Sequence, residues 1–177
     1  MKEKSTEKPD TWNKLARWAS AKSLWILHYC TGCGAIEMPA FMTSRYDSER
    51  FGIGPMATPR QADILLVTGY INNKTLKRLI KTYEQMSEPK YIIAHGSCPA
   101  NGGIYWDSHA TAKKLDLYLP VDLWVAGCMP RPEAIYDAVI QLMDDIKAGK
   151  TKGWKDYKEK FEWYKRNQRK VFGGDFI

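Results

Sequence analysis

The sequence lacks any apolar run of the length, about 18 residues or more, that a membrane-spanning helix needs. Its first ten residues, MKEKSTEKPD, are polar and mixed in charge and contain no apolar signal-peptide core. We therefore expect neither secretion by the usual route nor a membrane-spanning segment. Cysteine is limited to four in 177 residues. In an intracellular chain of this size, that number favours metal binding or redox chemistry over structural disulfides.

The net charge of +7 is concentrated in the two ends of the chain. Residues 1–22 carry six Lys/Arg against three Asp/Glu, and residues 147–177 carry ten against four, whereas the middle is slightly negative. A nucleic-acid-binding domain more often carries its basic stripe on the folded core. We therefore expect no nucleic-acid partner. The basic ends are either solvated tails or segments that lie on an acidic partner or an anionic membrane surface.

Short apolar runs alternate with helical patterns along the middle of the chain. The runs are typical of buried strands and cover 23–29, 63–69, 91–95 and 120–126. Helices are predicted over 10–22, from about 34, over 73–87 and over 132–147. Near-continuous apolar strands that alternate with helices predict an α/β fold, with a parallel sheet covered on both faces. Ligands bind at the carboxyl edge of such sheets.

The cysteines follow the predicted strands. Cys30 comes directly after the run 23–29, Cys98 lies just past 91–95, and Cys128 lies just past 120–126. Parallel strands deliver their carboxyl ends to one edge, so these thiols are expected to converge there, and Cys33 can join them from the loop that holds Cys30. Four converging sulfurs suit a tetrahedral metal site or a cubane cluster.

Other chemistries are possible for the Cys-x-x-Cys pair. A redox dithiol needs only Cys30 and Cys33 and leaves the other two cysteines without a role. Structural zinc usually takes two close pairs, but Cys98 and Cys128 are single and widely spaced. Four unrelated buried cysteines are the simplest alternative. Glycines beside or near three of the cysteines leave backbone N–H groups free to bond cluster sulfurs, which favours an iron–sulfur cluster.

The motifs GAIEM, RYDSERFG, TPRQADILLVTG, YEQMSEPKYIIAHGSC and PVDLWVAGC occur in that order. Over about residues 23–147 the chain resembles the NuoB-like subunit of respiratory complex I and the small subunits of energy-converting membrane-bound NiFe hydrogenases. The resemblance implies a flavodoxin-like, doubly wound α/β fold. It also implies one 4Fe–4S cluster, the last of an electron relay, with Cys30, Cys33, Cys98 and Cys128 as ligands. The domain would cover 23–149, between a basic amphipathic arm (1–22) and a basic aromatic arm (150–177).

The chain departs from both branches at the first cysteines. Complex I subunits carry adjacent cysteines in CCAIE, where this sequence has Cys33 and Gly34. Hydrogenase small subunits reach their acidic residue in three steps, as in CNGCDIE, whereas Cys33 and Glu37 are four steps apart. A third similar branch is the archaeal membrane-bound sulfane sulfur reductase, which is the branch we expect. A hydrogenase or a quinone-reducing subunit is the alternative, and a stand-alone Cys-x-x-Cys thiol oxidoreductase or a zinc-stabilised binding protein is the alternative from another class.

The resemblance also implies a setting for the protein. It would be a peripheral subunit on the cytoplasmic face of the cell membrane. Its partners would be a large catalytic subunit that shares the active site, a ferredoxin-like subunit with several clusters, and membrane subunits. No direct nucleotide binding is expected. The chain would relay electrons and catalyse no bond chemistry alone.

Several residues around the cysteines are candidates for supporting roles. Gly34, Ser97 and Gly127 are expected to offer backbone or hydroxyl donors to the cluster, although Ser97 is equally explained as a turn residue. Glu37 could couple protons to electrons, as the matching acid does in hydrogenase relatives, or could simply complement the helix dipole.

The arginines and histidines complete the candidates. Arg45, Arg50 and Arg60 fall in family motifs on the face toward the large subunit and the membrane, or are ordinary ion-pair partners. His28 and His95 are expected to be hydrogen-bonding neighbours of the cysteines and not ligands. Residues 10–22 could lie along the membrane interface or on a membrane subunit, because they form a basic helix with tryptophan. Residues 150–177 are expected to wrap a partner.

Overall fold

A five-stranded parallel sheet forms the centre of the protein, whose structure is a computed structural model that describes residues 10–172. The strands lie in the order β2-β1-β3-β4-β5 and are β1 (Leu24–Cys30), β2 (Ile53–Pro55), β3 (Ile64–Thr68), β4 (Tyr91–His95) and β5 (Leu123–Val125). This is the flavodoxin-like strand order, as expected. The connections leave β1 and β3 in opposite directions along the sheet, so the switch point lies between these two strands.

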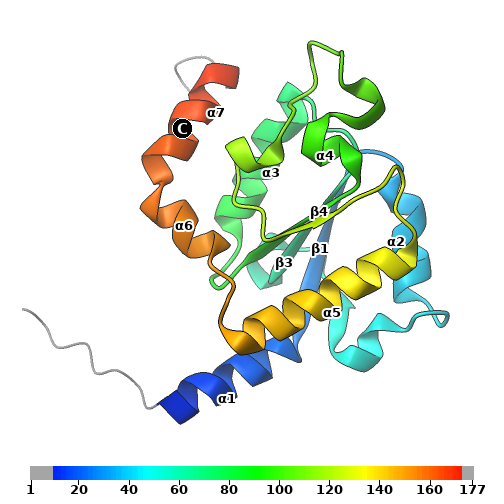
Figure 1. Ribbon diagram of the computed structural model, residues 1–177, viewed down its shortest axis with the longest axis vertical. Coiled ribbons are helices and arrows are strands. Elements are labelled where there is room, and N and C mark those ends of the chain that lie inside the picture. The colour runs from blue at the N-terminus through cyan, green and yellow to red at the C-terminus, as the bar shows by residue number, and fades with distance from the viewer. Residues whose placement is uncertain (1–9, 173–177) are drawn as a thin grey trace, which may run out of the picture.

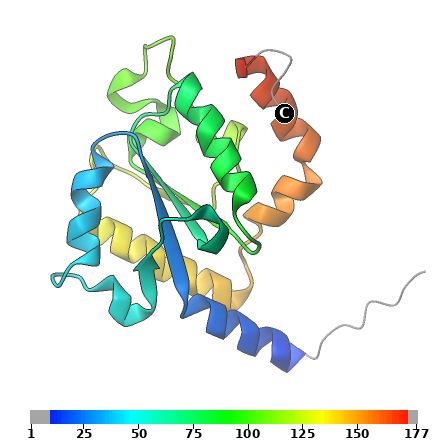
Figure 2. The same ribbon diagram turned by 180° about the vertical axis from the view of Figure 1, so that it is seen from behind.

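Helices cover both faces of the sheet (Figures 1 and 2). The helices are α1 (Asp10–Ala21), α2 (Gly34–Met42), α3 (Asn73–Gln85), α4 (Ser97–Asn101), α5 (Pro132–Ala148), α6 (Gly153–Glu159) and α7 (Phe161–Phe172). α2 and α5 lie on one face, with α1 against α5, and α3 lies on the other face with α6 and α7 beside it. Within the described residues, we find no helix with the length and hydropathy to cross a membrane.

The central strands are apolar because both of their faces are covered. Every residue of β3 and β4 is buried. One core cluster includes Leu65, Val67 and the inner side of α3, and the second includes Leu66, Ile93 and the inner side of α5. The alternation of strand side chains between the two clusters confirms the doubly wound layers.

Most predicted elements are present, with three differences. The strand 91–95 and the start of the helix at 132 agree with the structure, and 120–126 shortens to the three residues of β5. Cys30 is the last residue of β1 and not the residue after it. The short edge strand β2 was not predicted, because its three residues include a glycine and a proline, which are uncommon in strands.

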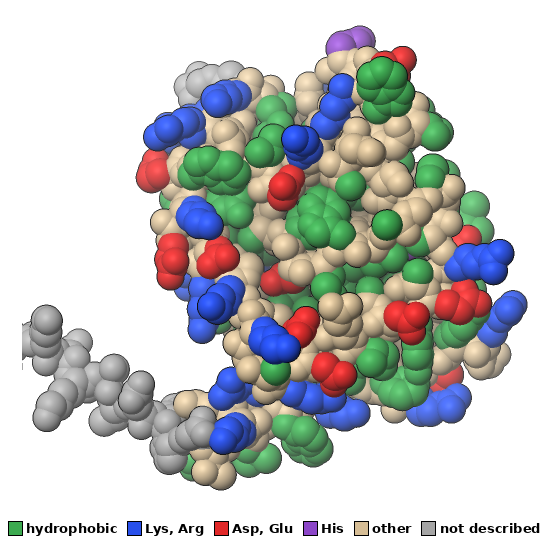
Figure 3. Space-filling model, in the orientation of Figure 1, with side chains coloured by type: hydrophobic (Ala, Val, Ile, Leu, Met, Phe, Trp, Pro, Cys, Tyr) green, Lys and Arg blue, Asp and Glu red, His purple; other side chains and the backbone are tan. Residues whose placement is uncertain are grey.

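The two basic ends of the chain are partly described. Residues 1–9 and 173–177 of the predicted arms lie outside the described residues. α1 packs on α5, whereas Tyr157 of α6 and Tyr164 of α7 are buried in the core cluster on the α3 face. Lys and Arg side chains gather over α6, α7 and α1 in Figure 3. The basic segments therefore lie against the sheet domain and present their charge outward.

Candidate metal centre

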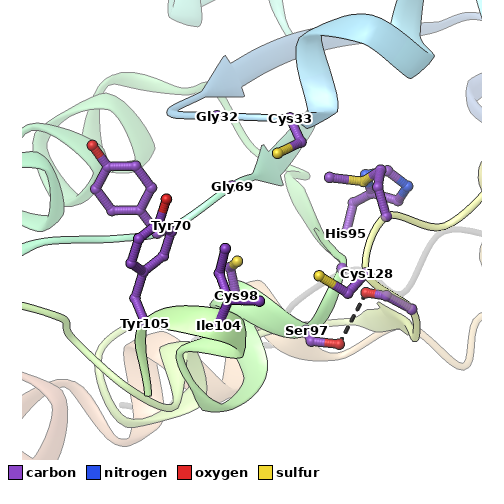
Figure 4. Close-up of a pocket in the computed structure, with 13 residues that line it drawn as sticks. Gly32, Cys33, Gly69, Tyr70, His95, Ser97, Cys98, Ile104, Tyr105 and Cys128 are labelled. Carbon is purple, nitrogen blue, oxygen red and sulfur yellow. Dashed lines mark hydrogen bonds between the residues drawn. The ribbon is translucent and has the colours of Figure 1, made fainter. Parts of the chain in front are cut away.

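A cavity of about 160 Å³ opens at the carboxyl edge of the sheet, beside the β1–β3 switch point. Three of the four cysteines line it: Cys33 from the loop after β1, Cys98 from α4 after β4, and Cys128 from the loop after β5. Figure 4 shows their sulfurs around one space. The other lining residues are Gly32, Gly69, Tyr70, His95, Gly96, Ser97, Ile104, Tyr105, Gly127 and Met129. The predicted convergence of thiols from separate strand ends is therefore found for these three.

Cys30 stands apart from the other three cysteines. It pairs with Thr68 in the register of β1 and β3, and it is not among the residues that line the cavity. Its thiol donates a hydrogen bond to the Gly32 carbonyl oxygen at 3.0 Å. Cys30 thus lies at the base of the loop that carries Cys33, and a change of its side-chain rotamer and of this loop would be needed to bring its sulfur to the other three.

Hydrogen bonds tie the cysteine-bearing loops to their neighbours. The Ser97 hydroxyl donates to the Gly127 carbonyl at 2.9 Å, and the Ser97 N–H donates to the same oxygen at 2.8 Å (Figure 4). In the same way, the Thr31 N–H donates to the Thr68 carbonyl at 3.1 Å. The Ser97 hydroxyl therefore joins the Cys98 and Cys128 loops in this structure, and its proton points to Gly127.

Two glycines allow close packing at the site. A Cβ at Gly103, which has φ +55°, would stand 2.8 Å from the Cys98 sulfur, so the loop can close over this thiol only without a side chain. A Cβ at Gly34 would stand 2.2 Å from the Thr68 Cβ. Gly34 is buried at the start of α2, so its lack of a side chain lets this helix begin directly on β3.

The environment of Cys98 disfavours a lone thiolate. Burial raises the pKa of the Cys98 thiol, and the neighbouring Cys128 and Cys33 raise it further, because charges of the same sign repel. A hydrogen bond from the Ile104 backbone acts in the opposite direction and lowers this pKa. Three thiols this close need positive charge among them before all can ionise.

Two histidines lie toward the carboxyl ends of β1 and β4: His28 is partly buried and His95 is fully buried. The His28 Nε2 and the Thr68 hydroxyl share a hydrogen bond of 2.8 Å, and burial lowers the pKa of His28. His95 lines the cavity, and burial, followed by the nearby His28, lowers its pKa to about 4. Both rings are therefore neutral near pH 7.

The remaining predicted residues lie outside the cavity. Glu37 is in the first turn of α2 and is partly exposed. Arg45, Arg50 and Arg60 are exposed; Arg45 stacks on Tyr46 with its guanidinium 5.6 Å from the ring centroid, and Arg50 forms an ion pair of 3.1 Å with Asp47. The functional roles of these four residues stay predictions.

The chain matches a known protein family over most of the sheet domain. Residues 30–142 match the family described as NADH ubiquinone oxidoreductase, 20 Kd subunit. The chain belongs to this family.

Relatives of this 20 kDa subunit family match over most of the chain. NAD(P)H-quinone oxidoreductase subunit K 1 of Gloeobacter violaceus is 41% identical over 160 residues, which is 90% of this chain and 66% of the relative. Subunit K of a Synechococcus species is 50% identical over 133 residues, which is 75% of this chain and 54% of the relative. The chain thus spans less than two thirds of the length of these relatives.

A solved structure matches more closely. A chain in the structure of the membrane-bound sulfane sulfur reductase, an archaeal respiratory membrane complex, is 59% identical and superimposes with a TM-score of 0.87. The match covers 90% of each chain. At this identity both the fold and the subunit type agree with the 20 kDa family.

The 20 kDa family is known for an iron–sulfur cluster, and the residues of the cavity fit one. Among residues 10–172, no three His, Cys, Asp or Glu side chains are close enough to hold a single metal ion. The ligands of a cubane bind different irons and therefore stand farther apart than those of one ion. Three thiols around one cavity, a fourth thiol at the start of the loop that carries Cys33, and an imidazole without a partner in the cavity wall suit such a group.

Several residues of the site were not predicted from the sequence. Tyr70 and Tyr105 form part of the cavity wall with their ring centroids 4.9 Å apart, and Ile104 supplies a backbone donor to Cys98. The adjacent glycines Gly102 and Gly103 could have indicated this loop as part of the site, since adjacent glycines mark a loop that approaches another group closely. The aromatic pairing depends on two loops and could not be read from either alone.

Proposed function

We propose that the chain is an electron-transfer subunit that holds one 4Fe–4S cluster through Cys30, Cys33, Cys98 and Cys128. The single observation that carries this proposal is the cavity shared by three thiols from three strand ends, at the edge where sheets of this order bind ligands. When bound, such a cluster accepts and releases single electrons. The protein's own part is to hold the thiolates, exclude water and present hydrogen-bond donors to sulfur.

Cys30 is the least supported of the four ligands, because its thiol bonds to Gly32. It is nevertheless well placed by sequence, three residues from Cys33 at the mouth of the same loop. Cys30 is the last residue of β1 and Cys33 directly precedes α2, and the loop between them contains Gly32, whose backbone can reorient at low cost. Rotation of the Cys30 side chain, together with a movement of this loop, would release its bond to Gly32 and free the thiol to bind iron.

The complex proposed for this subunit is a membrane-bound sulfane sulfur reductase. The 59% identity to a chain of such a complex supports this branch above the others. The cluster would pass electrons to an active site shared with a large catalytic subunit, after receiving them from a ferredoxin-like subunit with several clusters. Membrane subunits would hold the chain at the cytoplasmic face. A quinone-reducing role is the second candidate, favoured by the names of the subunit K relatives; a NiFe hydrogenase is the third.

Residues outside the cavity complete the proposal. Glu37 would couple proton movement to electron transfer from the first turn of α2, close in sequence to Cys33. The exposed Arg45, Arg50 and Arg60 would face partner subunits or lipid headgroups. The backbone of Gly34 and Gly127 would support the cluster, and Ser97 would hold the Cys98 and Cys128 loops together through its bonds to Gly127.

Anaerobic purification of the full chain with iron and sulfide analysis and EPR of the reduced sample tests the cofactor. We expect about four irons and four sulfides per chain. Zinc in place of iron, or a metal-free protein with a titratable dithiol, would contradict the proposal. To test the branch, the intact complex is purified through a tag on this chain, and its rates with sulfane sulfur, quinone and protons are compared. Stoichiometric nickel in that complex would favour the hydrogenase instead.

A further inference from the structure

His95 is a fully buried side chain whose two ring nitrogens form no hydrogen bond within the described residues. It is the last residue of β4, it is 0% exposed, and it lines the same cavity as the three thiols (Figure 4). Neither Nδ1 nor Nε2 has a hydrogen-bond partner among residues 10–172. A buried polar group without a partner destabilises a fold. Such a group in the wall of a cavity is explained most simply by a bond to what the cavity binds.

The groups around His95 do not supply that bond. Thr68 is its register neighbour on β3, but the Thr68 hydroxyl is engaged by the His28 Nε2 at 2.8 Å. The Pro130 backbone favours the protonated ring slightly, yet no hydrogen bond of normal geometry joins them. On the cavity side, the lining includes the thiols of Cys33, Cys98 and Cys128 and the thioether of Met129.

The chemistry of the ring matches a sulfur acceptor. Burial holds the pKa of His95 at about 4, so the ring is neutral near pH 7 and carries one N–H donor and one acceptor nitrogen. Cysteine thiolates and the sulfides of a cluster only accept hydrogen bonds. In a hydrogen bond between His95 and such a sulfur, the ring N–H is therefore the donor and the sulfur is the acceptor.

We propose that His95 donates a ring N–H to a sulfur of the cluster held in this cavity and thereby raises the cluster's reduction potential. This inference rests on the proposed function. An N–H···S bond strengthens when the acceptor gains negative charge, so it stabilises the reduced cluster more than the oxidised one. His95 would thus set the driving force of electron transfer, and it would not be a ligand to iron.

The test compares three variants of the full chain in reconstituted, cluster-loaded form. His95→Leu removes the donor at similar volume, and His95→Gln keeps an N–H donor. Met129→Leu is the matched control, since Met129 lines the same cavity but has no N–H in its side chain. Each variant is analysed for iron and sulfide and then titrated potentiometrically with EPR detection. We expect full iron in all three, a negative shift of midpoint potential in His95→Leu, a smaller shift in His95→Gln, and none in Met129→Leu.

A second measurement detects the hydrogen bond directly. Proton ENDOR of the reduced wild-type protein should show an exchangeable coupling that disappears in D₂O and is missing in His95→Leu. Equal potentials and equal exchangeable couplings in wild type and His95→Leu would overturn the assignment of His95. Loss of iron from His95→Leu and His95→Gln alike would also overturn it, because His95 would then be a ligand. A wild-type chain that binds no iron would instead contradict the proposed function.

Discussion

The two ends of the sheet are built in opposite ways. At the amino end, the Asp122 carboxylate accepts hydrogen bonds from the Ile92 N–H at 2.9 Å and the Gly153 N–H at 3.2 Å, and the Asp63 carboxylate accepts one from the Trp25 N–H at 3.0 Å. At the carboxyl end, thiols line an open cavity and His95 has no hydrogen-bond partner among the described residues. At the amino end the carboxylates are hydrogen-bonded within the protein. At the carboxyl end the three thiols and the His95 ring remain available to a ligand.

This difference separates stability from function. Side-chain carboxylates at the amino end fasten β1, β4 and the start of α6 to the strands beside them. The carboxyl end instead relies on glycines with positive φ, such as Gly69 (+82°), Gly96 (+95°) and Gly127 (+137°), to turn the chain sharply after each strand. Substitutions at the amino end should therefore affect unfolding, and substitutions of the cysteines should affect cofactor content.

The largest expected effect is loss of the cluster from cysteine variants. Cys98→Ser and Cys30→Ser should each lower the iron content from about four per chain to a small fraction of that, because a cubane needs all four thiolates. Urea unfolding of the metal-free proteins should change little, since neither residue is fully buried. Iron and sulfide analysis after anaerobic reconstitution measures the first effect. If Cys30→Ser retained four irons, Cys30 would not be a ligand.

The second effect is expected at the amino end. Asp122→Ala leaves the Ile92 and Gly153 N–H groups without their acceptor and should lower the free energy of unfolding by about 2–3 kcal/mol. Iron content should stay at the wild-type level. Asp144→Ala is the control, because its exposed ion pair with Lys147 contributes little to stability. A cluster lost together with stability in Asp122→Ala would show that the two ends are not independent.

Sequence alone predicted the layers and the position of three thiols. The apolar runs 63–69 and 91–95 identified the two strands that are buried on both faces, and the cysteines that follow the runs 23–29, 91–95 and 120–126 identified the edge. Both inferences use local pattern and the geometry of parallel sheets, which the sequence carries directly. The three-residue strand β2 escaped notice because its pairing with β1, and not its own composition, makes it a strand.

Other features of the site depend on contacts between distant segments. Ser97 was expected to donate to the cluster or to shape a turn, but its hydroxyl bonds the Gly127 carbonyl, 30 residues away. His95 was expected to be a hydrogen-bonding neighbour, and its lack of a partner is visible only once the surrounding strands are in place. The role of Gly34 depends likewise on Thr68. Such relations arise from packing, so single positions do not reveal them.

The third effect concerns the packing beneath the carboxyl end. Gly34→Ala should lower the free energy of unfolding by about 1–3 kcal/mol, because its Cβ would lie 2.2 Å from the Thr68 Cβ. Thr68→Gly in the same chain should recover part of this loss, which a double-mutant cycle measures as a coupling energy. Gly32→Ala is the control, since its nearest neighbour would be 3.5 Å away. If Gly34→Ala lowered the free energy of unfolding equally in the wild-type and the Thr68→Gly backgrounds, the contact between residues 34 and 68 would be contradicted.

The last effect is a pH dependence at the amino end. Burial raises the pKa of Asp122 to about 6 from 3.8, so the folded protein binds more protons than the unfolded chain between these values. Stability from this group is therefore complete below about pH 4 and is lost as the pH rises through 6. We expect a loss of about 3 kcal/mol over this range. Asp122→Asn lacks this titration, so its free energy of unfolding should improve relative to wild type between pH 4 and pH 7 in urea melts. If the free energies of unfolding of the two proteins differed by the same amount across that range, Asp122 would have the same pKa in the folded and unfolded states. Burial at the amino end would then not disfavour its charged form.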